Sequence, residues 1–207
     1  MFPPQVPARA SSFIPLAAVL FLAALLCAAC GAGTWRGTAL EPPLEVPAIA
    51  GVDHRGDPFD SGSLEGRLQV VFFGYTFCPD ICPATLHEVA DALSAQSQAV
   101  QQQVDVLFVT VDPQRDGLGR LEAYVGQFHP SVKGIRLEDP EALASLTTGY
   151  GVYVDSGAEA TDDDVYLVDH TTRVYVLNRD GHMALTYASD LKAEDLAADL
   201  KRLAKQR

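Results

Sequence analysis

A short, almost uninterrupted apolar run at residues 68–76 is the feature that most restricts the fold of this 207-residue chain. A strand buried on both faces has this pattern, because helices cover both sides of a parallel sheet. Apolar residues then recur at helical spacing after Pro83, at Leu86, Val89, Ala90 and Leu93. A second buried strand is expected at residues 104–111. Strand, helix and strand in this order predict a βαβ unit with a right-handed crossover.

The second half of the chain has shorter patterns of both kinds. Helices are expected at residues 116–128, 141–146 and 193–205, and strands at 165–168, 173–177 and 183–187. A parallel half, an antiparallel half and a final helix are typical of the thioredoxin-like fold. We therefore predict an α/β protein whose central mixed sheet is flanked by helices, in one domain at residues 48–207.

The N-terminal segment has the features of a targeting signal and of a membrane anchor. Its apolar run at residues 13–29 ends with two alanines, and Cys30 and Gly31 follow directly. This ending resembles the lipobox of bacterial lipoproteins, in which a signal peptidase cuts before a cysteine that carries lipid. Cys27 stands where that motif usually has leucine, and an uncleaved transmembrane anchor is the alternative.

Both alternatives attach the chain to a membrane. We expect a signal peptide or membrane anchor at residues 1–29, lipid on Cys30 and a proline-containing tether at residues 30–47. The protein should then lie in the bacterial cell envelope, outside the cytoplasm and anchored to the membrane as a lipoprotein.

Composition excludes two classes of protein. The chain has 15 Lys and Arg residues against 27 Asp and Glu residues, a formal net charge of −12. Nucleic-acid binding depends on neutralising phosphates with basic side chains, so no nucleic-acid partner is expected. Apolar residues make up 48% of the chain, which excludes an intrinsically disordered protein.

Two cysteines follow the first buried strand, where open α/β sheets place their functional sites. Cys78 and Cys82 lie in the sequence FGYTFCPDICP at residues 73–83, with three residues between them. On the opening turn of a helix this spacing puts both sulfurs on one side, and the helix N-terminus favours thiolates. Two thiolates are soft ligands that suit Cu(I), zinc or iron–sulfur chemistry. A structural disulfide is the alternative in an oxidising compartment.

Histidine can complete such a site. His170, between two β-rich segments, is the best candidate, since imidazole with two thiolates suits copper in both oxidation states. The alternative for His170 is a hydrogen-bonded structural role. The other histidines have no partner pattern and are expected to be surface or structural residues: His54, His87, His129 and His182. Asp112, after the second strand, is expected either to border the site or to serve as a turn carboxylate.

Three segments resemble the signature blocks of the Sco/SenC family. They are GYTFCPDICP at residues 74–83, VTVDPQRD at residues 109–116 and DHT at residues 169–171. The resemblance implies a thioredoxin-like fold and a membrane-tethered copper protein that acts in assembly of the CuA centre of cytochrome c oxidase. It places the copper-binding cysteines of the family on Cys78 and Cys82, and its copper-binding histidine on His170.

Two functions fit these residues. The first is a metallochaperone, which is not an enzyme: it receives Cu(I) or Cu(II) from an upstream copper donor and passes it to the oxidase subunit that carries CuA. The second is a thiol–disulfide reductase that uses Cys78 and Cys82 as a redox dithiol and keeps the cysteines of that subunit reduced. His170 discriminates between them, because a reductase does not require it.

Overall fold

The computed structural model describes residues 34–155 and 166–206. The expected signal peptide or anchor at residues 1–29 and the predicted lipidation site, Cys30, lie outside the described residues. Among the helices in the described part of the chain, none combines the length and the apolar character that crossing a bilayer requires.

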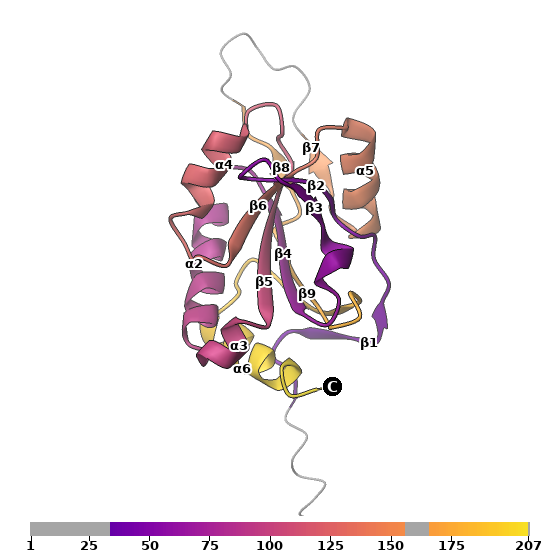
Figure 1. Ribbon diagram of the computed structural model, residues 1–207, viewed down its shortest axis with the longest axis vertical. Helices are drawn as coiled ribbons and strands as arrows, with labels where there is room; N and C mark the ends of the chain where they lie inside the picture. Colours follow the sequence, from indigo (N-terminus) through magenta and orange to yellow (C-terminus); the bar gives the residue numbers. More distant parts are fainter. Residues whose placement is uncertain (1–33, 156–165, 207) are drawn as a thin grey trace, which may run out of the picture. The chain divides into compact units, whose positions relative to one another are not determined.

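A mixed sheet of eight strands forms the centre of the described residues (Figure 1), in the order β1-β10-β9-β4-β5-β6-β2-β3. At its middle, β4 (Leu68–Gly74) and β5 (Val104–Thr110) run parallel, and β6 (Val132–Arg136) lies parallel to β5. The outer strands are antiparallel: β1 (Thr38–Leu44), β2 (Ala50–Asp53), β3 (Pro58–Asp60), β9 (Val174–Leu177) and β10 (Met183–Tyr187). A separate antiparallel pair joins β7 (Val154–Asp155) to β8 (Asp169–His170).

Helices cover both faces of the sheet. Their bounds are η1 (Ser61–Leu64), α2 (Ile81–Ser94), α3 (Gln98–Gln101), α4 (Leu118–Val125), α5 (Pro140–Gly149) and α6 (Ala193–Leu203). In Figure 1, α2 and α4 lie on one side of the strands and α5 lies on the other. The last helix, α6, packs against α2. The result is a three-layer α/β arrangement.

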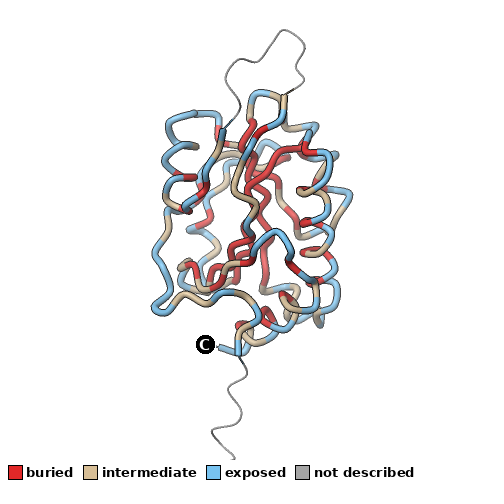
Figure 2. The backbone as a smooth tube through the Cα atoms, turned by 180° about the vertical axis from the view of Figure 1, so that it is seen from behind, coloured by how far each residue is buried: buried red, intermediate tan, exposed pale blue. Residues whose placement is uncertain are grey.

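The two central strands form the core. Every residue of β4 and β5 is buried. Figure 2 shows the buried residues, in red, running through the centre of the view. Phe72 of β4 packs against Phe108 of β5, with ring centroids 6.2 Å apart. Because each fully buried large apolar side chain contributes about 1.5–3 kcal/mol, the burial of this strand pair stabilises the fold strongly.

The predicted fold class is confirmed. The parallel β4-α2-β5 unit, the antiparallel β9–β10 pair and the final helix α6 form a thioredoxin-like arrangement around a central mixed sheet. The first helix begins at Ile81, with Asp80 as its N-cap, and not at Pro83. Proline fits inside this first turn because the amide groups there have no helical acceptor.

The structure differs from the predicted elements in several places, and the strands β2, β3 and β6 have no counterpart among the predicted strands. Residues 38–44, expected in the tether, form β1 at the edge of the sheet, where prolines such as Pro42 are tolerated. The helix expected at residues 116–128 is the shorter α4, since Asp116 uses its carboxylate to bind neighbouring loops. Residues 166–168 are not a strand, and β8 follows them at Asp169–His170.

We expect Gly74→Ala to destabilise the protein. A Cβ at Gly74 would lie 2.7 Å from Cε2 of Phe108 and 3.1 Å from the Cys82 sulfur. Overpacking of this kind costs about 1–3 kcal/mol, which urea denaturation should record as a lower midpoint. Gly119→Ala in α4 is the matched control, because no atom lies within 4 Å of its added Cβ. Equal midpoints for the two variants would contradict this packing.

Candidate metal centre

The cysteine motif occupies the turn between β4 and α2. Cys78 precedes the helix, and Cys82 is its second residue. The backbone N–H of Cys78 donates to the carbonyl of Tyr75 (3.3 Å), and the N–H of Cys82 donates to the Cys78 sulfur (3.4 Å). Because the N-cap Asp80 makes no side-chain capping bond, the Cys78 sulfur acts as an acceptor at the positive end of the helix.

The two thiols have opposite electrostatic environments. The hydrogen bond from the Cys82 thiol, with backbone N–H donors, lowers the pKa of Cys78 to about 5. The same hydrogen bond and complete burial raise the pKa of Cys82. At neutral pH the pair therefore consists of one thiolate, Cys78, and one thiol, Cys82. Both sulfurs are free in the structure and do not form the disulfide that the sequence left as an alternative.

The fold brings His170 to this pair from a distant part of the chain. Residue 170 lies in β8, opposite Val154 of β7, and its Nε2 lies 3.6 Å from the Cys82 sulfur. Its Nδ1 lies 3.1 Å from the carbonyl of Thr171. Since a carbonyl can only accept, Nδ1 carries the proton and the lone pair of Nε2 faces the sulfur. Burial lowers the pKa of His170, which favours the neutral imidazole.

The separation of sulfur and nitrogen fits a metal ion between them. Bonds of about 2.3 Å to sulfur and about 2.0 Å to nitrogen, the lengths that zinc makes, separate the two ligands by about 3.5 Å at a tetrahedral angle. Within residues 34–155 and 166–206, however, no three ligating side chains are already set around a common point. Metal binding therefore needs the Cys82 proton to leave and the three donors to close together.

Aromatic rings surround the imidazole. Phe72 and Tyr75 both pack edge-on against His170, with ring centroids 6.3 and 5.9 Å away. Tyr75, three residues before Cys78 along the chain, thus forms part of the wall around the imidazole. Such rings limit the access of water and hold the imidazole plane in place.

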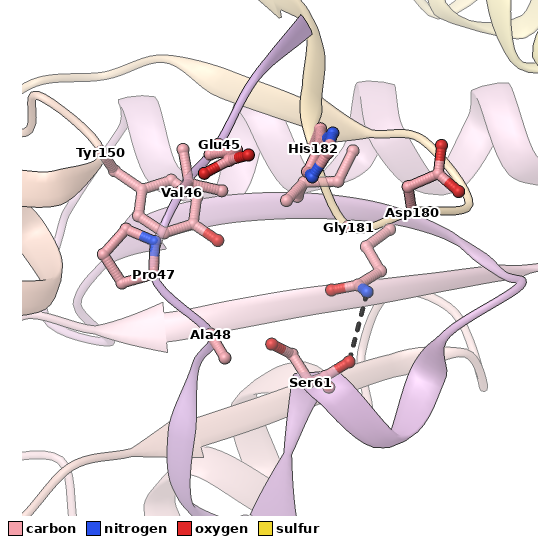
Figure 3. A pocket seen from close by; sticks show the side chains of 12 residues that line it. Glu45, Val46, Pro47, Ala48, Ser61, Tyr150, Asp180, Gly181 and His182 are labelled. Atoms are coloured by element: carbon pink, nitrogen blue, oxygen red, sulfur yellow. Dashed lines mark hydrogen bonds between the residues drawn. The ribbon is translucent and has the colours of Figure 1, made fainter.

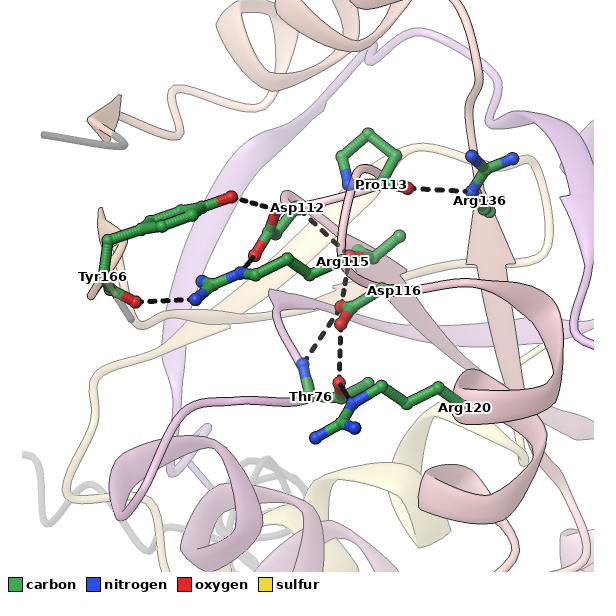
Figure 4. A network of polar contacts seen from close by, with 9 residues as sticks. Thr76, Asp112, Pro113, Arg115, Asp116, Arg120, Arg136 and Tyr166 are labelled. Atoms are coloured by element: carbon green, nitrogen blue, oxygen red, sulfur yellow. Dashed lines mark hydrogen bonds and ion pairs between the residues drawn. The ribbon is translucent and has the colours of Figure 1, made fainter. Parts of the chain in front are cut away.

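A buried carboxylate joins the loops that follow β4 and β5 (Figure 4). Asp116 is fully buried and accepts hydrogen bonds from the backbone N–H of Thr76 (3.0 Å) and the hydroxyl of Thr110 (2.6 Å). Burial raises its pKa. Asp112 forms an ion pair with Arg115 and accepts from the Tyr166 hydroxyl (2.9 Å). Sequence reasoning did not assign roles to Thr76, Arg115 or Tyr166, since no local pattern marks these long-range contacts.

The other histidines have structural surroundings. Nδ1 of His54 accepts from the backbone N–H of Gly134 (3.2 Å), and Nδ1 of His129 accepts from that of Ser131 (3.1 Å). His87 packs edge-on against Phe128, with centroids 4.9 Å apart.

Two hollows lie near different parts of the fold. A cavity of about 250 Å³ is lined by Gln69, Tyr150 and His182 among others (Figure 3), and neither cysteine of the motif nor His170 is among its described lining residues. A groove of about 760 Å³ is lined by Val154, Asp112 and Tyr166 among others. Because Val154 pairs with His170, this larger groove borders the strand pair that carries the histidine.

Comparison with known proteins decides the family. The SCO1/SenC family profile matches residues 41–205. The chain belongs to the SCO1/SenC family. Relatives include the protein SCO2 homolog, mitochondrial, of Mus musculus, which is 33% identical over 152 residues, covering 73% of this chain and 59% of the relative. The match thus spans about three-fifths of that relative's length.

Solved structures of the family have the same fold. Bradyrhizobium japonicum ScoI with copper bound is 34% identical, with a TM-score of 0.67 over 76% of this chain and 98% of that protein. Apo Sco1 from Thermus thermophilus is also 34% identical, with a TM-score of 0.74 over 84% of this chain and 99% of that protein. This SCO1/SenC protein is therefore thioredoxin-like in fold.

The pKa of about 5 for Cys78 gives a prediction for thiol reactivity. A thiolate reacts with iodoacetamide and a thiol does not, so the alkylation rate of Cys78 should rise through pH 5 and be constant from pH 6 to 8. Cys82 should stay unmodified over this range. In Cys82→Ala the donor to Cys78 is lost, and the midpoint should move upwards. A wild-type midpoint near pH 8.5, the value of an ordinary thiol, would contradict the assignment.

Proposed function

We propose that this SCO1/SenC protein carries copper between Cys78, Cys82 and His170 and delivers it to the CuA centre of cytochrome c oxidase. The observation that supports this most directly is the 3.6 Å separation of Nε2 of His170 from the Cys82 sulfur. Two sulfurs and one imidazole are a donor set that suits copper in both oxidation states. The copper-bound relative from Bradyrhizobium japonicum supports the choice of metal.

The protonation states of the three candidate ligands suit both the uptake and the release of copper. Cys78 is already a thiolate, so it can bind incoming copper without first losing a proton. Fully buried Cys82 must lose its proton before it binds, while neutral His170 binds through Nε2. On release, ligands of the acceptor would replace the three donors in turn, and Cys82 would regain its proton.

The proposal includes a membrane tether. Lipid on Cys30 would hold the domain at the outer face of a membrane in the bacterial cell envelope, where it would receive copper from an upstream donor. The oxidase subunit that carries the CuA site is the proposed acceptor. A lipoprotein of this kind keeps donor and acceptor at the same surface, which raises their effective concentration.

A second candidate function is thiol–disulfide exchange, favoured by the unequal pair of thiols. The Cys78 thiolate would attack a disulfide of the target subunit and form a mixed disulfide, with one target thiolate leaving. Cys82 would then lose its proton and attack Cys78, which forms the Cys78–Cys82 disulfide and releases the second target thiolate. Two electrons pass from this protein to the target, and His170 takes no part.

Substitution of the proposed ligands separates the two functions. Cys78→Ala should abolish tight copper binding, because one sulfur and one imidazole remain. His170→Ala should keep Cu(I) on two sulfurs but lose Cu(II), and its ability to metallate the CuA subunit should fall with it. The measurements are copper stoichiometry, Cu(II) absorption spectra and metallation of the purified acceptor.

His129→Ala is the matched control, because its imidazole accepts only from the backbone N–H of Ser131 among the contacts described above. It should bind and transfer copper as the wild-type protein does. A thiolate-to-copper absorption band in Cys78→Ala would refute the ligand assignment. Full activity of His170→Ala in maintaining reduced acceptor cysteines, with no copper transfer by the wild type, would establish the reductase instead.

Lipidation of Cys30 gives an independent prediction. Cells that express the full chain should incorporate labelled fatty acid into it, and Cys30→Ser should abolish both the label and membrane association. Cys27→Ser, three residues earlier, should keep both. Label that persists in Cys30→Ser would exclude Cys30 as the lipidated residue, and membrane association without any label would indicate an uncleaved anchor.

A further inference from the structure

Arg115 lies buried between the two segments that carry the candidate ligands. Its side chain is 8% exposed, and its Nε donates to Oδ2 of Asp112 at 2.5 Å. Its Nη1 donates to the carbonyl of Tyr166 at 2.9 Å (Figure 4). A charged group buried this far is stable when it is paired, and the planar guanidinium fixes the direction of each hydrogen bond.

The guanidinium also lies over aromatic rings from both segments. Its central carbon is 3.4 Å from the centroid of Tyr166 and 4.7 Å from that of Phe77. Phe77 directly precedes Cys78 in the sequence. Tyr75, whose centroid is 5.8 Å from the guanidinium carbon, packs against the imidazole of His170. Cation–π attraction acts over these distances, so Arg115 holds the cysteine loop and the Tyr166 segment together.

The segment that Arg115 holds leads directly to His170. Tyr166 precedes His170 by four residues and is fixed at both ends, since its carbonyl accepts from Arg115 and its hydroxyl donates to Asp112. The strands that pair around the histidine, β7 and β8, have only two residues each. A strand pair this short supplies few backbone hydrogen bonds. Side-chain contacts must therefore fix most of the position of the segment that carries His170.

We infer that Arg115 is a positioning residue that keeps the imidazole of His170 within reach of the Cys82 sulfur. Its action passes through Tyr166 on the histidine side and Phe77 on the cysteine side, and it is not itself a ligand. Its effect on copper rests on the proposed function, whereas its effect on the order of the His170 segment does not. Loss of Arg115 should loosen the imidazole more than the two sulfurs, because Arg120 also stacks on Phe77 and remains on the cysteine side.

Arg115→Gln in the full chain tests this inference, with Arg120→Gln as the matched control. The guanidinium of Arg120 lies 3.5 Å from the Phe77 centroid and its Nε donates to the Thr76 hydroxyl (2.8 Å), so these contacts involve the cysteine loop alone. Both variants remove one positive charge near the site, and Arg115→Gln alone releases Tyr166.

The first measurement needs no metal. The amide of Thr171, next to His170, donates to the carbonyl of Tyr153 (3.0 Å). Its hydrogen exchange should become about tenfold faster or more in Arg115→Gln, stay unchanged in Arg120→Gln, and leave the amides of β4 unaffected in both. Equal acceleration throughout β4 would indicate general destabilisation and would overturn the inference.

The second measurement uses Cu(II) itself. Loss of a residue that orients a ligand typically weakens metal affinity about 10- to 100-fold, so Cu(II) should dissociate faster from Arg115→Gln by that factor. The imidazole nitrogen signal in its electron paramagnetic resonance spectrum should weaken, while Cu(I) affinity stays close to that of the wild type. Arg115→Lys should restore little of the wild-type Cu(II) affinity, because an ammonium group lacks the planar set of N–H donors of a guanidinium.

The outcomes are distinguishable. Wild-type exchange at Thr171 together with wild-type Cu(II) dissociation in Arg115→Gln would overturn the positioning role. Absence of an imidazole signal in the wild-type protein would refute the proposed copper site, and Thr171 exchange would still decide the role of Arg115. Should Arg115→Gln fail to fold because Asp112 is left unpaired, the double variant Asp112→Asn/Arg115→Met removes both charges and gives the same two readouts.

Discussion

The parallel pairing of β4 with β5 is the constraint on which the candidate site depends. Parallel neighbours end at the same edge of the sheet, so the loop with the cysteines and the loop with Asp112 and Asp116 must lie side by side. The backbone N–H of Val111 donates to the carbonyl of Gly74 at 2.8 Å, which continues the ladder to this edge. Asp116 then joins the two loops through Thr76 and Thr110.

The antiparallel half of the sheet brings the third candidate donor, His170, to the same edge. β9 pairs with β4, and the chain that enters β9 passes through β8 and His170. The rigid part of the site is therefore the end of β4 and the start of α2, while the histidine lies on a two-residue strand. This combination suits the proposed carrier function, in which copper must be both held and released.

Much of this arrangement could be predicted from the sequence, because the decisive signals are local. The apolar run of β4 and the cysteine spacing lie within residues 68–83, and the family signature adds His170 from a distant position. The β1 strand was missed because its exposed residues and Pro42 have the composition of a linker. The stacking of Arg115 on Tyr166, 51 residues away along the chain, has no periodic signal and exists only in the folded protein.

X-ray absorption spectroscopy of the copper-loaded full chain tests the three-ligand site, since it reports the donor atoms around the ion. Two sulfur neighbours and one imidazole nitrogen are expected, with the nitrogen absent from the spectrum of His170→Ala. A wild-type spectrum with sulfur neighbours alone, unchanged by removal of the imidazole, would contradict the three-ligand site.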